Sequence, residues 1–135
     1  MFGLRLLTAV AILSSAPGTT AQSGALYSCV DTQTARPVEI GMTICNASPT
    51  EALAARLEDD NLQRRSGALI TDVSAGSLAQ IAGLAPGDVI YRVGGVDVED
   101  EVETSTQLDQ IGDDADTVVN FLRGGRPYRV KLRQR

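Results

Sequence analysis

The chain lacks the side chains on which most hydrolytic and metal-dependent enzymes rely. It contains no histidine, so neither a Ser-His-Asp triad nor a Cys-His pair can form. A Ser-Lys dyad would have to use Lys131, the only lysine, which stands among arginines near the C-terminus. Residues 113–116 include three aspartates but lack the spacing and the glycine of a calcium loop, and zinc-type spacings are also missing. We therefore expect a protein that is not an enzyme and that needs no metal or other cofactor.

The first 21 residues have the pattern of a secretory signal peptide. A short start with one basic residue precedes an apolar run at 6–13, which is too short to span a bilayer as a mature helix. Small and polar residues then end in a cleavage site before Gln22. The alternative is an uncleaved N-terminal anchor. Cleavage would leave about 114 residues, enough for one domain, in the periplasm or outside the cell and without further membrane contact.

Cys29 and Cys45 are the only cysteines. In an exported chain an even number of cysteines more often forms disulfides than free thiols, and a redox-active pair would usually be spaced Cys-x-x-Cys. We predict a Cys29–Cys45 bond. In the chain-entropy model, a loop of this length would stabilise the fold by roughly 3 kcal/mol.

The charge balance is acidic, with 17 Asp and Glu against 12 Lys and Arg. Such a balance argues against a nucleic-acid or anionic-membrane binder. The exception is the C-terminal segment, whose basic residues are Arg123, Arg126, Arg129, Lys131, Arg133 and Arg135. A solvated strand face explains them most simply, and attraction of an acidic partner is the alternative.

Periodicity and turn residues predict strands that alternate with short helices. We expect strands at 25–30, 38–45, 67–73, 88–93 and 96–98, a hairpin at 117–133, and helices at 49–57, 77–82 and 100–111. Residues 31–37 are expected to form a loop, because they are polar and include Pro37. Ser48, Pro49 and Glu51 form a capping box for the first helix. Val102, Leu108 and Ile111 should provide the apolar contacts of the last helix, with Gly112 ending it.

The run Gly83-Leu84-Ala85-Pro86-Gly87-Asp88-Val89-Ile90 combines a helix stop, a tight turn and the start of a buried strand. It resembles the core of a PDZ domain, in particular the kind appended to bacterial HtrA/Deg-type periplasmic proteases, here without a protease domain. Residues 66–79, 90–98 and 122–125 also fit that pattern, so the resemblance extends over residues 38–135. It implies an α+β fold, a small partly open β-barrel or sandwich of five to six strands with two to three helices. Residues 22–37 would then form an N-terminal extension that carries Cys29.

The resemblance also implies a binding site. In this family, backbone N–H groups of an apolar-Gly-apolar loop hold the terminal carboxylate of a peptide, and Ile40-Gly41-Met42 matches that loop. The ligand would add as a strand beside Met42-Thr43-Ile44, with Leu108 and Ile111 of the last helix lining the opposite wall. The alternative for Ile40, Met42 and Ile44 is simple core packing. The acidic helix region, residues 99–107, would favour ligands with basic residues upstream of their C-terminus, unless it is only a solvated face.

Two functions follow from this resemblance. The first is an exported stand-alone module that binds peptide or protein C-termini by strand addition, as an adaptor or regulator of an envelope protease or secretion component. The alternative is a structural docking module whose groove is occluded. In that case a Cys29–Cys45 bond could hold Leu26-Tyr27-Ser28 across the groove.

Overall fold

The computed structural model describes residues 24–111 and 116–133. The predicted signal peptide, Gly112 and the aspartates at 113 and 114 lie outside the described residues. No helix in these two ranges is long and apolar enough to cross a membrane.

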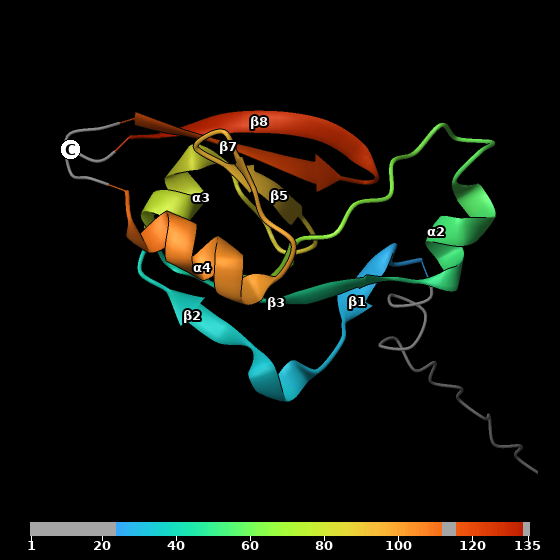
Figure 1. The fold of residues 1–135 in the computed structure, drawn as a ribbon, viewed down its shortest axis with the longest axis horizontal. Helices are drawn as coiled ribbons and strands as arrows, with labels where there is room; N and C mark the ends of the chain where they lie inside the picture. The colour runs from blue at the N-terminus through green and yellow to red at the C-terminus, as the bar shows by residue number, and fades with distance from the viewer. Residues whose placement is uncertain (1–23, 112–115, 134–135) are drawn as a thin grey trace, which may run out of the picture.

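In the described residues, eight strands form one antiparallel sheet, and three α-helices and a 3-10 turn accompany them (Figure 1). The main path of the sheet is β1-β3-β4-β5-β7-β8, while β2 pairs with β3 and β6 with β5. The strands are β1 (Tyr27–Cys29), β2 (Arg36–Val38), β3 (Met42–Pro49), β4 (Ala68–Val73), β5 (Val89–Val93), β6 (Val96–Asp97), β7 (Asp116–Arg123) and β8 (Arg126–Arg133). The helical elements are η1 (Thr32–Thr34), α2 (Glu51–Arg56), α3 (Leu78–Ala82) and α4 (Glu101–Asp109). The predicted α+β class is confirmed, but the sheet stays open rather than closing into a barrel.

Six of the eight strands, β3 to β8, lie in residues 38–135, where five to six strands were predicted, and β1 lies in the strand expected at 25–30. The strand that was not predicted is β2. The single strand expected at 38–45 is divided by a turn at Gly41, whose φ is +98°. A residue with a side chain is strained in that region, whereas glycine is not. The chain therefore reverses, and Arg36–Val38 pairs with Met42–Ile44 instead of forming a loop.

The predicted capping box at Ser48 is wrong. β3 continues through Pro49 because β1 pairs with it, with Tyr27 opposite Pro49 and Ser28 opposite Ser48. The N-cap of α2 is Thr50, whose hydroxyl donates to the Ala25 carbonyl at 2.6 Å instead of capping the helix. Pairing between strands has moved the start of this helix downstream of its local signal.

The run at 83–90 folds as its residues predict. Ser77 caps α3 by accepting a hydrogen bond from the Gln80 N–H at 3.1 Å, and Gly83 ends it in the left-handed conformation. Asp88 is 1% exposed, accepts from the Ala85 N–H at 2.9 Å, and forms two hydrogen bonds with Arg123 of β7. The turn is therefore tied to the C-terminal hairpin by an ion pair.

Two apolar clusters stabilise the sheet. The main core includes Ile40, Met42, Ile44, Ile70, Ile90, Leu108, Phe121 and Leu132. The second core includes Tyr27, Cys45, Leu53, Leu62, Leu69, Val89, Tyr91 and Leu122. The predicted Cys29–Cys45 disulfide is present, with a Cα–Cα distance of 5.6 Å, and it attaches β1 to β3 beside the second core.

The buried Tyr27 predicts a loss of stability at alkaline pH. Its hydroxyl donates to the Gln63 carbonyl at 3.3 Å and accepts from the Arg65 N–H at 3.1 Å, and burial raises its pKa above the ordinary value of 10.0. Because the folded state disfavours the phenolate, this contribution is complete below about pH 10 and is lost as pH rises through the folded-state pKa.

Urea unfolding between pH 8 and pH 11 should therefore show a steeper decline for the parent chain than for Tyr27→Phe. Tyr128→Phe, at a half-exposed position on β8, is the control and should follow the parent. Parallel curves for the parent and Tyr27→Phe would contradict the assignment.

Candidate functional site

The loop Glu39-Ile40-Gly41 is held in place by the segment that leads into α3. The carbonyl of Ile40 accepts from the Ala79 N–H at 2.9 Å, and that of Gly41 accepts from the Ser74 N–H at 2.8 Å. The Gly41 N–H donates to the carbonyl of Val38 at 3.0 Å. A Cβ on Gly41 would collide with the Cβ of Ser77, so α3 lies directly against the turn. The loop is fixed through its carbonyls, and the Gly41 amide is presented toward β2.

β3 and α4 stand where the two walls of the expected groove would be, beside this loop, and α4 contacts both β2 and β3. Asp100 caps α4 by accepting from the Glu103 N–H at 2.8 Å, and the buried residues of the helix are Glu101, Thr104, Ser105 and Leu108. Val102 is 47% exposed, so its predicted apolar contact is wrong. Because residues 101, 104, 105 and 108 share one helical face, it is this face that packs on the sheet.

The structure brings the predicted site residues together. Ile40, Met42, Ile44 and Leu108 are buried in the main core, and Ile111 packs against it. Thr43 is half-buried on β3, where its carbonyl accepts from the Thr71 hydroxyl at 3.2 Å. Ile40, Met42 and Ile44 therefore have the alternative role, packing in the core, and no ligand is needed to explain their burial.

The edge of β3 that faces the groove is occupied by the chain itself. β2 pairs there in antiparallel register, with Val38 opposite Met42, Pro37 opposite Thr43 and Arg36 opposite Ile44. α4 contacts both β2 and β3, and Figure 1 shows β2 and α4 on the same side of the molecule, while β3 runs on from there toward β1 and α2. Val38 is 7% exposed and belongs to the main core with Met42 and Leu108. The expected site of strand addition is thus filled by residues 36–38.

The prediction that Leu26-Tyr27-Ser28 lies across the groove is wrong. β1 pairs with Ala47–Pro49, at the other end of β3. Sequence reasoning missed Arg36–Val38 because Pro37 indicated a loop, although proline is compatible with an edge strand. The apolar Val38 just before the loop was the one available signal.

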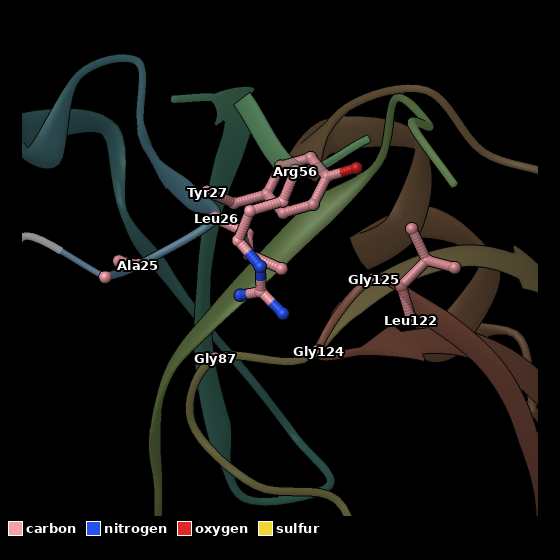
Figure 2. Close-up of a pocket in the computed structure, with 9 residues that line it drawn as sticks. Ala25, Leu26, Tyr27, Arg56, Gly87, Leu122, Gly124 and Gly125 are labelled. Atoms are coloured by element: carbon pink, nitrogen blue, oxygen red, sulfur yellow. The ribbon is translucent and has the colours of Figure 1, made fainter. Parts of the chain in front are cut away.

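A separate hollow of about 250 Å³ lies beside the second core (Figure 2). The Arg56 guanidinium points into it between the segment at Ala25–Leu26 and the turns at Gly87 and Gly124, but its Nε already donates to Asp60 at 2.7 Å. Glycine backbone makes up much of the remaining lining. In the described ranges, no group of three or more acidic or cysteine side chains is placed to hold a metal ion. The loop and β3 therefore remain the candidate site, rather than this hollow.

Comparison with known proteins agrees with this geometry. Residues 69–133 match the family model described as PDZ domain. The chain contains a PDZ domain. PDZ domains are peptide-binding modules and carry no catalytic machinery of their own. The match begins in β4 and ends with β8, so the loop, β2 and β3 lie before it.

The relatives of this PDZ domain are of the HtrA type, as predicted. A protein described as "Putative serine protease HhoB", from Synechocystis sp. (strain ATCC 27184 / PCC 6803 / Kazusa), is 41% identical over 70 residues. The alignment spans 50% of this chain but 16% of that protein.

Two solved structures share the fold. The HtrA-type protease AlgW with decapeptide has a TM-score of 0.56 at 20% identity, over 73% of this chain and 29% of that one. The HtrA3 PDZ domain bound to a phage-derived ligand (FGRWV) has a TM-score of 0.56 at 19% identity, over 71% and 84% of the two chains.

Proposed function

We propose that this chain is an exported, non-catalytic module that binds peptide or protein C-termini by strand addition to β3, as an adaptor or regulator in the cell envelope. One observation carries the proposal. An extended segment already pairs with Met42–Ile44 in antiparallel register and ends with a buried valine beside the Gly41 amide. A ligand in the same register would place its last side chain at the position of Val38 and its carboxylate at Gly41.

The chemistry of the groove suits such a ligand. The Gly41 N–H lies on a loop fixed through its carbonyls, and a backbone amide preorganised in this way stabilises an anion. Met42, Ile44 and Leu108 favour an apolar last side chain. α4 carries acidic but no basic residues, which favours a ligand with basic residues upstream of its C-terminus.

Export is supported by the disulfide and by the relatives. A Cys29–Cys45 bond persists in oxidising compartments such as the periplasm, and HtrA-type proteases act there or outside the cell. The partner we propose is the C-terminus of an envelope protein, such as a protease or a secretion component.

A closed-groove docking module is the second candidate. The pairing of β2 with the ligand edge favours it, because a groove that β2 never leaves accepts no free peptide. In that case the protein would bind its partner through another surface.

Peptide titration separates the two candidates. Peptides with apolar C-terminal residues would be added to the mature chain while the amide resonances of Gly41 and Thr43 are followed by NMR. Peptides with a free carboxylate should bind at least about tenfold more tightly than their C-terminal amides, because hydrogen bonds to charged groups are roughly twice as strong as neutral ones. Equal binding by amides would exclude carboxylate capture, and unchanged resonances with every peptide would support the closed-groove module.

Gly41→Ala should impair both folding and binding. A side chain at Gly41 combines strain at a φ of +98° with a collision against Ser77, so we expect a loss of more than about 2 kcal/mol in the free energy of unfolding. Gly76→Ala is the matched control, since Gly76 has a φ of +76° but no atom within 4 Å of the added Cβ. It should cost only about 1 kcal/mol, from strain alone. Equal losses in urea unfolding would mean that the contact with Ser77 does not constrain the loop.

A further inference from the structure

β2 has the properties of a ligand more than those of a framework strand. It is three residues long and pairs only with β3. Pro37 has no N–H, so the segment can serve only as an edge strand. Val38 is its one buried side chain. It packs in the main core together with residues of the loop, β3 and α4. Removing Val38 would leave the walls of the groove intact, because they belong to β3, α4 and the loop.

The end of β2 imitates a C-terminus incompletely. The Val38 carbonyl accepts from the Gly41 N–H at 3.0 Å, where a ligand carboxylate would bind. Because the chain continues into Glu39, this carbonyl is neutral, and it interacts more weakly with an amide donor than a carboxylate does. A free peptide therefore has a chemical advantage over β2 at the loop.

β2 has a different advantage over a free peptide, because it is covalently tethered to β3. Only residues 39–41 separate it from β3, and on its other side the chain is attached to β3 through the Cys29–Cys45 bond. A tethered segment acts at a high effective concentration, so it re-enters the groove faster than a dilute peptide. The apparent affinity for a peptide is then reduced by the fraction of molecules in which β2 has left the groove.

We propose that Arg36-Pro37-Val38 is an internal ligand that blocks the PDZ groove, so that an external C-terminus must displace it in order to bind. This inference rests on the proposed function, since it requires the groove to accept peptides. It also specifies the ligand: a C-terminal segment that ends in a small β-branched apolar residue such as valine, with a basic residue two positions earlier.

Val38→Ser tests the proposal directly. The probe is the hexapeptide Gln-Thr-Ala-Arg-Pro-Val with a free carboxylate, which copies residues 33–38. The substitution weakens the internal ligand without changing the groove walls, so the peptide should bind about tenfold more tightly than to the parent chain. Val30→Ser is the matched control, because Val30 lies in the same disulfide-closed loop but is 61% exposed. It should bind the peptide as the parent does.

Val38→Thr provides a second variant if Val38→Ser folds poorly. Threonine keeps the shape of valine and adds a hydroxyl, so a gain of about threefold is expected. In the parent chain, NMR should also show that the resonances of Val38 move as the peptide binds, since β2 leaves the groove.

The outcomes separate this proposal from the proposed function. If the parent and Val38→Ser bind the hexapeptide and the peptides with apolar C-terminal residues with equal affinity, the groove is a peptide site but β2 does not block it. If neither protein binds any of these peptides, both the proposed function and the proposal of an internal ligand are wrong. Tight binding by Val38→Ser with weak or undetectable binding by the parent confirms the proposal.

Discussion

Replacing Arg123 with alanine should lower the free energy of unfolding by about 3 kcal/mol. The Arg123 Nε donates to Asp88 Oδ1 at 2.8 Å and Nη2 donates to Oδ2 at 2.7 Å, while Nη2 also donates to the Gly83 carbonyl at 2.7 Å. Without Arg123, the buried carboxylate keeps only the hydrogen bond from Ala85. Breaking a buried ion pair by removing one partner costs about 3–5 kcal/mol, and the half-exposed arginine places this pair at the lower end.

Arg92→Ala is the control for this prediction. Arg92 also forms a 2.7 Å hydrogen bond with an aspartate, Asp97, but both side chains are exposed to solvent. Such pairs contribute at most about 1 kcal/mol. Urea unfolding of the two variants should therefore differ by about 2 kcal/mol, and equal losses would show that burial of Asp88 does not govern the pair.

The comparison of Asp88→Asn with Arg123→Ala adds a second check. An asparagine can still accept the Ala85 N–H, and the half-exposed Arg123 can be solvated after its partner is neutralised. We therefore expect Asp88→Asn to be less destabilising than Arg123→Ala. The ion pair attaches the 83–90 turn to β7, so its main effect is on the framework that carries the loop and α3.

The elements whose residues act locally fold as their sequence predicts. Ser77, Gly83 and Gly87 set the cap, the end of α3 and the following turn, and each acts within a few residues of its own position. Residues 66–98 consequently fold close to the prediction, and they carry most of the resemblance to PDZ domains. The buried partner of Asp88 was not predicted, because Arg123 is 35 residues away.

The segments that differ from the prediction are those in which pairing with a distant strand decides the structure. Ser48, Pro49 and Glu51 form a credible capping box, but pairing with β1 draws Ser48 and Pro49 into β3. Similarly, Pro37 is typical of a loop, but the exposed edge of β3 gives it a place as an edge strand. Local propensity is a weak prior, and hydrogen-bonded pairing with a buried strand overrides it.

The family resemblance identified Ile40, Gly41, Met42, Leu108 and Ile111 as candidate site residues. The structure buries Ile40, Met42 and Leu108 in the main core, with Ile111 packed against it. Glycine permits both an extended strand and a reversal, so the sequence at 38–45 did not reveal that Gly41 turns the chain back. That reversal is what brings Val38 into the groove.

Removal of the disulfide should cost about 3 kcal/mol of global stability. The Cys29–Cys45 bond spans a sequence separation of 16 residues, and a loop of that length gives about 3 kcal/mol in the chain-entropy model. Cys45 is fully buried in the second core, so Cys29→Ala with Cys45→Ala also loses a small amount of packing. Reduction of the parent chain should therefore reproduce most, but not all, of the loss in the double variant.

The disulfide also limits the movement of β2, because β2 lies inside the loop that the bond closes. Residues 30–44 contain all of β2 and the part of β3 with which it pairs, so the bond restricts how far β2 can move when it leaves. Reduction should lower the urea midpoint of the parent and leave that of the double variant unchanged. A midpoint shift that corresponds to less than about 1 kcal/mol would mean that β1 pairing alone holds this segment. In that case the turn at 39–41, rather than the disulfide, would be the main tether of the internal ligand.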